Sequence, residues 1–138
     1  MGNFYIKYDT TLQSNETYWF PLMTELLPVF TEVEVHCRED EKEAIYKIKP
    51  YAHTIRFESG FVIFTMPLNY RLKDLLLYEV SEGNRVIPWF RLVFKRNGSH
   101  ICTVKQHGTE LFFYQISIED AKEIESFFPE NTTIEYME

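Results

Sequence analysis

Cysteine and positive charge are both scarce in this chain, and each scarcity argues against a class of protein. The 138 residues include only two cysteines, Cys37 and Cys102, too few for a disulfide-stabilised scaffold. Lysine and arginine number 14 against 21 aspartate and glutamate residues, which gives a net charge of −7. Nucleic-acid binding needs clustered basic side chains that displace phosphate counterions. The composition therefore predicts no nucleic-acid partner, and it is compatible with a basic protein partner.

Long apolar runs and the common catalytic motifs are also missing. No run approaches the roughly 20 residues that span a bilayer, and the first residues lack the basic region and apolar stretch of a signal peptide. We therefore expect a cytoplasmic protein with no membrane partner. The sequence contains neither G-x-S-x-G nor a glycine-rich phosphate-binding motif. It predicts no cofactor and favours a non-catalytic function, although catalysis by scattered residues stays open.

Aromatic residues, in contrast, are abundant. Phenylalanine, tyrosine and tryptophan make up 17% of the chain, and hydrophobic residues as a whole make up 45%. This content favours a folded chain over a disordered one, and the length suits a single domain over residues 1–138. Because one small core has limited room, some aromatic side chains are expected at the surface.

Hydrophobic periodicity predicts an α+β fold, a mostly antiparallel sheet with about three helices in the order β-α-βββ(β)-α-βββ-α-β. Its part α-βββ-α-ββ(β)-α resembles the element order of secretion-chaperone-like domains, a likeness of fold alone. Helices are expected over 17–29, from Pro67 to a point before Gly83, and from Ser117 to Pro129. Strands are expected over 4–8, 31–38, 44–49, 54–57, 61–66, 87–96, 100–106, 110–116 and 132–136. Ser59-Gly60 predicts a two-residue hairpin turn between the strands at 54–57 and 61–66. Ser117-Ile118-Glu119-Asp120 resembles the capping box that starts a helix.

The stretch N-G-S-H-I-C-T-V-K-Q-H-G, residues 97–108, holds two histidines and a cysteine. Asn97-Gly98 is a strong signal for a type I′ hairpin turn, and His107-Gly108 indicates a second two-residue turn. The strand between these turns separates His100 from His107 by roughly 20 Å. One ion cannot bridge that distance, so the pattern predicts no metal site.

The two turns also predict how the three strands pair. The first turn places Lys95 opposite His100, Phe94 opposite Ile101 and Val93 opposite Cys102. The second places Lys105 opposite Glu110 and Cys102 opposite Phe113. One face would then be the core, with Phe90, Leu92, Phe94, Ile101, Thr103, Phe112, Tyr114 and Ile116. The other face would carry Trp89, Arg91, Val93, Lys95, Cys102, Val104, Leu111 and Phe113.

This second face looks too apolar to remain in contact with water. Helices of the same domain, a homodimer or protein partner, or a small-molecule pocket are the three alternatives. Tyr70 and Tyr78 lie off the apolar stripe of the helix after Pro67 and form another candidate contact surface. The predicted partner-binding residues are Trp89, Arg91, Val93, Phe113, Tyr70 and Tyr78.

The sequence thus favours a small acidic interaction module, such as an inhibitor, an immunity protein or a chaperone-like partner, acting through an aromatic sheet or helix face. The alternative is a small-molecule-binding domain or an enzyme with an unrecognised site. Its polar candidates would be His53, Arg56, Glu58, Tyr70 and Arg91.

Overall fold

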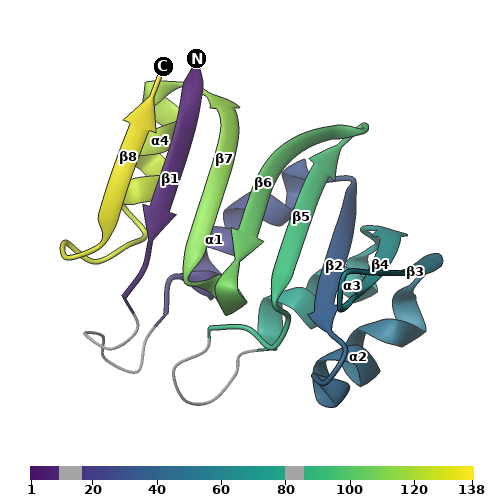
Figure 1. Cartoon of the computed structure of the whole chain (residues 1–138). Coiled ribbons are helices and arrows are strands. Elements are labelled where there is room, and N and C mark those ends of the chain that lie inside the picture. Colours follow the sequence, from purple (N-terminus) through teal and green to yellow (C-terminus); the bar gives the residue numbers. More distant parts are fainter. Residues whose placement is uncertain (10–16, 80–85) are drawn as a thin grey trace.

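In the part of the chain that the structure describes, eight strands pair antiparallel in one sheet (Figure 1). The computed structural model describes residues 1–9, 17–79 and 86–138. The order across the sheet is β3-β4-β2-β5-β6-β7-β1-β8, which confirms the predicted α+β class. The strands are β1 Gly2–Lys7, β2 Glu32–Arg38, β3 Thr54–Glu58, β4 Phe61–Pro67, β5 Arg91–Arg96, β6 Ser99–Lys105, β7 Glu110–Ile116 and β8 Thr133–Met137.

The described residues form four α-helices, where about three were predicted. They are α1 Trp19–Leu26, α2 Lys42–Ile48, α3 Tyr70–Tyr78 and α4 Ile118–Glu125. The additional helix, α2, replaces the strand predicted over 44–49. Ala44 and Ile48 are one helical turn apart and both are buried, so a helix places them together on the core. None of the described helices is long and apolar enough to cross a membrane.

The first residues of α3 and α4 follow local sequence signals more closely than the number of helices does. Ser117 caps α4, and its hydroxyl accepts a hydrogen bond from the Asp120 amide at 3.1 Å, as the capping-box pattern predicts. Asn69 caps α3 in the same way, through the Leu72 amide. Pro67 does not open this helix, because it is the last residue of β4.

All four helices pack on one face of the sheet. Their buried residues join a single core cluster with alternate residues of the strands, such as Val33, Val35 and Cys37 of β2. In Figure 1, α1 and α4 lie behind the sheet. We call the face turned away from the helices the open face.

The pairing of β5 with β6 departs from the predicted register. Asn97 (φ 50°) and Gly98 (φ 85°) form the expected turn, and Lys95 lies opposite His100 as predicted. A β-bulge then shifts the ladder, so that Phe94 lies opposite Cys102 and not opposite Ile101. An extra residue in one strand moves every later side chain to the other face. The predicted composition of both faces is therefore wrong.

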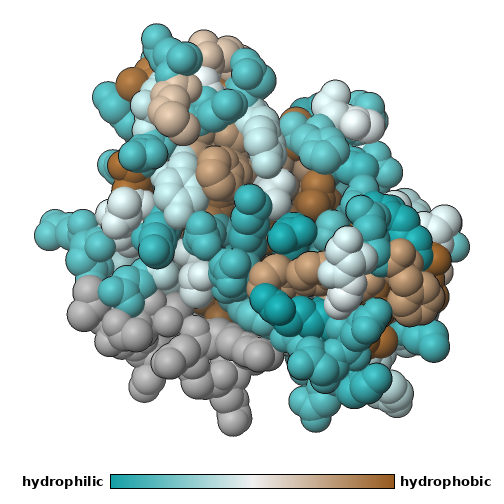
Figure 2. Space-filling model, viewed as in Figure 1, coloured by the Kyte–Doolittle hydropathy of each residue, from teal (hydrophilic) through white to brown (hydrophobic). Residues whose placement is uncertain are grey.

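The bulge removes the apolar second face. Cys102, Val104, Leu111 and Phe113 join Leu92 and Phe94 in the helix-covered core. The open face keeps Arg91, Val93 and Lys95, which alternate with those core residues along β5. Figure 2 shows this face as mostly hydrophilic, with smaller apolar areas. The first alternative, coverage by helices of the same domain, thus holds for Cys102, Val104, Leu111 and Phe113 but not for Val93.

The second predicted turn is longer than two residues. Gln106, His107 and Gly108 all have positive φ, and they form a short 3-10 turn. The register that it sets is nevertheless as predicted, with Lys105 opposite Glu110 and Cys102 opposite Phe113. His107 is held by its side chain, whose Nε2 lies 3.0 Å from a Glu41 carboxylate oxygen.

Candidate functional site

The hairpin of β3 and β4 leaves β3 at the edge of the sheet (Figure 1). Ser59 (φ 49°) and Gly60 (φ 85°) form the turn predicted for this hairpin, and both adopt the left-handed backbone of a type I′ turn. The turn sets Glu58 opposite Phe61, and the ladder continues to Thr54 opposite Thr65. Within the described sheet, β3 has a partner strand on one side only.

Every residue of this edge strand is exposed. Phe57 is 73% exposed and Ile55 44% exposed, although both are large and apolar. They lie opposite Val62 and Phe64, whose side chains belong to the core cluster, so they project on the helix-covered side. Large apolar side chains exposed next to each other are typical of a contact surface.

The backbone of β3 is also exposed, because its outer edge pairs with no other strand of the described sheet. In a two-residue hairpin, the residues that flank the turn exchange hydrogen bonds, and bonded and non-bonded pairs then alternate. Glu58 and Arg56 therefore bond to β4. The amide and carbonyl groups of Ile55 and Phe57 point away from it, as on any sheet edge that can accept another strand.

A groove runs beside this edge, and α2 forms its second wall. Its volume is about 570 Å³. Lys42 and Lys49 line it together with one acid, Glu39. Its apolar lining is Ile45, Ile55, Phe57, Val62 and Phe64. Because the sequence pattern predicts a strand over 44–49, it does not reveal this wall or the groove.

The open face carries a separate cluster of charges around Glu34 of β2. One carboxylate oxygen lies 2.7 Å from Lys95 Nζ, and the other lies 3.2 Å from His36 Nε2 and 3.4 Å from an Arg56 guanidinium nitrogen. Burial alone would raise the pKa of Glu34. Hydrogen bonds from Lys95 and His36, with the charges of Lys95 and Arg56, outweigh burial and lower this pKa to about 2.

His36 is neutral at pH 7 in this setting. Burial lowers its pKa, and the positive charges of Arg91 and Arg56 lower it further against the opposing effect of Glu34. A neutral imidazole with its proton on Nε2 can donate the hydrogen bond to the Glu34 carboxylate. His36 thus acts as a hydrogen-bond donor within the sheet face.

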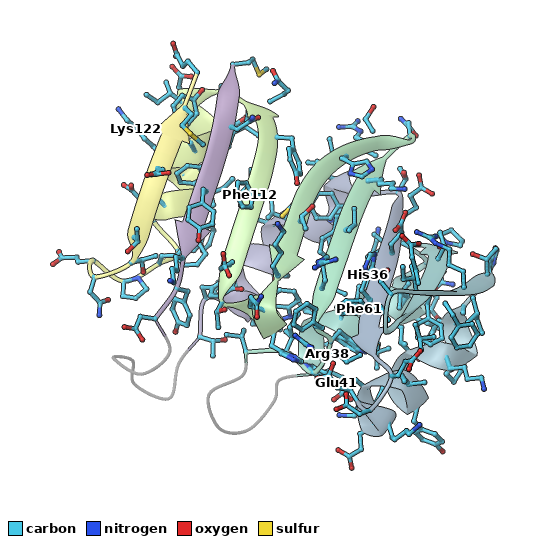
Figure 3. All side chains as sticks on the ribbon, viewed as in Figure 1. His36, Arg38, Glu41, Phe61, Phe112 and Lys122 are labelled. Atoms are coloured by element: carbon cyan, nitrogen blue, oxygen red, sulfur yellow. The ribbon has the colours of Figure 1, made fainter. Side chains whose placement is uncertain are left out.

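Two arginines and two phenylalanines form a second cluster on this face. Figure 3 shows two of its members, Arg38 and Phe61, near His36. The Arg38 guanidinium carbon lies 4.3 Å from the Phe90 ring centroid and 5.7 Å from that of Phe61. The Arg91 guanidinium carbon lies 5.5 Å from both centroids. We call these four residues the arginine–aromatic cluster; its contacts are cation–π interactions.

The structure places the predicted partner-binding residues of the sheet in two environments. Trp89 is fully buried and Phe113 is 1% exposed, so in this structure both belong to the core and neither lies on a surface open to a partner. Trp89 precedes β5 and donates from its indole Nε1 to the Ala44 carbonyl of α2. Val93 and Arg91 do lie on the open face, where neighbours bury Val93 and leave Arg91 half-buried.

The predicted helix residues Tyr70 and Tyr78 are exposed, at 73% and 66%. Tyr78 packs against Phe20 of α1, with ring centroids 5.6 Å apart. Of the alternative polar candidates, Arg56 bonds Glu58 on β3, while Tyr70 and Arg91 belong to α3 and β5. His53 immediately precedes β3 and is exposed.

Both thiols are free and buried. Burial raises the pKa of Cys37 to about 12 and raises that of Cys102 as well, so neither supplies a thiolate at neutral pH. Among residues 1–9, 17–79 and 86–138, no three His, Cys, Asp or Glu side chains form a group that could hold a metal ion.

The candidate binding site is the exposed edge strand β3 with the groove beside it, and its own geometry is the basis for interpreting it. No protein-family model matches this sequence, and neither the curated proteins nor the solved structures contain a match.

Proposed function

We propose that this protein is an interaction module that binds an extended segment of a partner protein along β3. The observation that carries the proposal is the edge strand itself. All five of its residues are exposed, it presents Phe57 and Ile55, and a groove of about 570 Å³ runs beside it.

Two kinds of contact support this binding mode. A partner strand would pair with the outward amide and carbonyl groups of Ile55 and Phe57, as in β-strand addition. Each such hydrogen bond contributes about 0.5–1.5 kcal/mol. Alternate side chains of the segment would enter the groove and cover Phe57, and burying such a ring contributes roughly 1.5–3 kcal/mol.

The groove also indicates what the segment carries. Its apolar lining suits large aliphatic or aromatic side chains at alternate positions. Lys42 and Lys49 outnumber Glu39 among the charged lining residues, so acidic residues in the segment are favoured. This local preference differs from the basic partner with which the net charge of the whole chain is compatible, and the two concern different surfaces.

Selection of short random peptides on the purified protein tests the proposal. We expect selected peptides to alternate apolar residues and to include acidic ones. Phe57→Glu should reduce their binding at least about tenfold, because it places a charge where an apolar side chain must pack. Tyr70→Glu is the matched control, since Tyr70 has the same 73% exposure on α3.

A backbone variant separates strand pairing from side-chain packing. Ile55→Pro removes an amide that points away from β4, so the hairpin should persist while peptide binding falls. Circular dichroism checks the fold. Loss of binding in Tyr70→Glu but not in Phe57→Glu would move the site to α3 and overturn the proposal. So would light scattering that shows a dimer which Phe57→Glu dissociates, because the occupant would then be a second copy.

A further inference from the structure

We propose that the arginine–aromatic cluster on the open face is an oxyanion site that binds a phosphate group between Arg38 and Arg91. This site lies on the opposite side of the sheet from the groove beside β3, and it does not depend on the function proposed above.

The geometry concentrates positive charge in one small area. Both guanidinium carbons lie within 5.7 Å of the same two ring centroids, those of Phe61 and Phe90. Phe90 is 4% exposed, so its ring is held in place by the surrounding residues and supports the guanidinium groups of Arg38 and Arg91. Rings that support a guanidinium group hold its fork in place, so less rotational freedom is lost when an anion binds.

Neither guanidinium group is neutralised within the described part of the chain. No ion pair or hydrogen bond of either side-chain group is observed there, and the Arg91 Nε is buried without a hydrogen-bond partner. A guanidinium group that is partly buried without a counterion is costly, and a bound anion would compensate its charge.

The neighbouring carboxylates are engaged by other groups. Glu34 is held by Lys95, His36 and Arg56. Glu41 accepts from the Arg38 backbone amide and pairs with the His107 ring. His36, which lies opposite Arg91 in the ladder, adds no negative charge. The two arginines therefore keep their charge for an external anion.

Charge matching favours phosphate over a carboxylate. Two guanidinium groups without counterions carry two positive charges, and phosphate carries about −1.5 to −2 at neutral pH, whereas a carboxylate carries one negative charge. Each arginine fork can also offer two parallel donors to the oxygens of one phosphate.

NMR of the arginine Nε–Hε groups during titration with inorganic phosphate tests this site directly. We expect saturable shifts at Arg38 and Arg91, with smaller shifts from acetate or sodium chloride at equal ionic strength. Arg71 and Arg96 are exposed and serve as internal controls whose signals should shift little.

A variant tests the clamp separately. The Arg38→Lys protein should fold normally, because Arg38 is exposed. It should bind phosphate about tenfold more weakly, because lysine lacks the two-donor fork of a guanidinium group. Arg96→Lys is the matched variant and should bind as the natural chain does.

Three outcomes would overturn the proposal. The shifts at Arg38 and Arg91 could be linear and equal to those at Arg71 and Arg96, which would indicate screening only. Acetate could produce the same saturable response as phosphate, which would make the site a general carboxylate site. Arg38→Lys could bind phosphate as tightly as the natural chain, which would exclude a two-arginine clamp.

Discussion

Single residues in this protein have roles that their chemical type does not reveal. Tryptophan is a common anchor of protein interfaces, yet Trp89 is in the core and tied by its indole to α2. Phenylalanine is a common core residue, yet Phe57 is largely exposed. The difference arises from position: Trp89 enters the core just before β5 starts, while Phe57 belongs to an edge strand.

Replacing Trp89 by alanine should therefore lower the free energy of unfolding by about 3–5 kcal/mol, the usual cost of removing a large buried aromatic side chain. Urea denaturation followed by fluorescence measures this, because the buried Trp19 remains as a probe. Trp89→Phe should cost less, since it keeps most of the ring volume. A loss below about 1 kcal/mol for alanine would contradict the assignment of Trp89 to the core.

Glu34 should make stability depend on acid pH. Its pKa falls from 4.5 to about 2 on folding, so its ion pairs contribute fully above about pH 4.5 and are lost as pH decreases toward 2. Glu34→Gln should remove roughly 2 kcal/mol of stability at pH 7 and flatten the decline between pH 4.5 and 2. Urea denaturation across this pH range measures both effects.

Glu58→Gln is the control for that experiment. Glu58 contacts the same arginine, Arg56, but its side chain is 61% exposed, so water screens the pair. Its replacement should change stability little at any pH. Equal pH profiles for the two variants would show that burial beside Lys95 and His36 does not strengthen the Glu34 interactions.

At the scale of elements, turns and caps are predictable because their signals are local. Asn97-Gly98, Ser59-Gly60 and the Ser117 cap all form where short-range rules place them. The bulge opposite Phe94 and Lys95 and the helical state of 42–48 depend on contacts across the fold. Cys102 faces the core because Phe94 and the helices are there, and Trp89 packs against Ala44 from 45 residues away.

The same distinction explains which parts of the candidate site the sequence does not reveal. The sequence predicts the β3–β4 hairpin, but pairing patterns within a hairpin do not tell which of its strands lies at the edge of the sheet. Arg38 likewise looks like one more outward residue of β2. Only the fold brings it to Phe61 of β4 and Phe90, which precedes β5.

Two glycine turns should respond differently to alanine. Gly98 has φ 85°, and the position that a Cβ would occupy there is open space, so Gly98→Ala should cost only the left-handed backbone penalty of about 1–2 kcal/mol. Gly108 has φ 91°, and a Cβ there would lie 2.8 Å from Val86 Cβ. Gly108→Ala should cost about 2–4 kcal/mol, because crowding adds to the backbone penalty. Thermal or urea unfolding compares them, and equal losses would contradict the close packing of this turn.

At the scale of the whole molecule, the two ends of the chain lie side by side. β1 pairs with both β7 and β8, and Asn3 lies opposite Met137 (Figure 1). The first strand is therefore held by strands more than a hundred residues away, as in the hydrogen bond from Tyr5 to Glu110, 105 positions later.

A circular permutant should fold faster than the natural chain. Joining Glu138 to Met1 through a short Gly-Ser linker, and opening the chain between Asp9 and Thr10, turns β8–β1 into a local hairpin and breaks no strand pair. Lower contact order speeds folding. Stopped-flow refolding measures the rate, and circular dichroism checks that the fold is kept. A slower rate with an unchanged fold would show that docking of β1 does not limit folding.

The position of β1 has a consequence for biosynthesis. Within this sequence β1 is made before both of its neighbours, β7 and β8, and at about 5–20 residues per second the interval is on the order of ten seconds. During that time Phe4 and Ile6, which end up buried, have no strand beside them. Strands β2 to β6 can therefore pair while β1 still waits, and β1 joins the sheet only after β7 and β8 have been made.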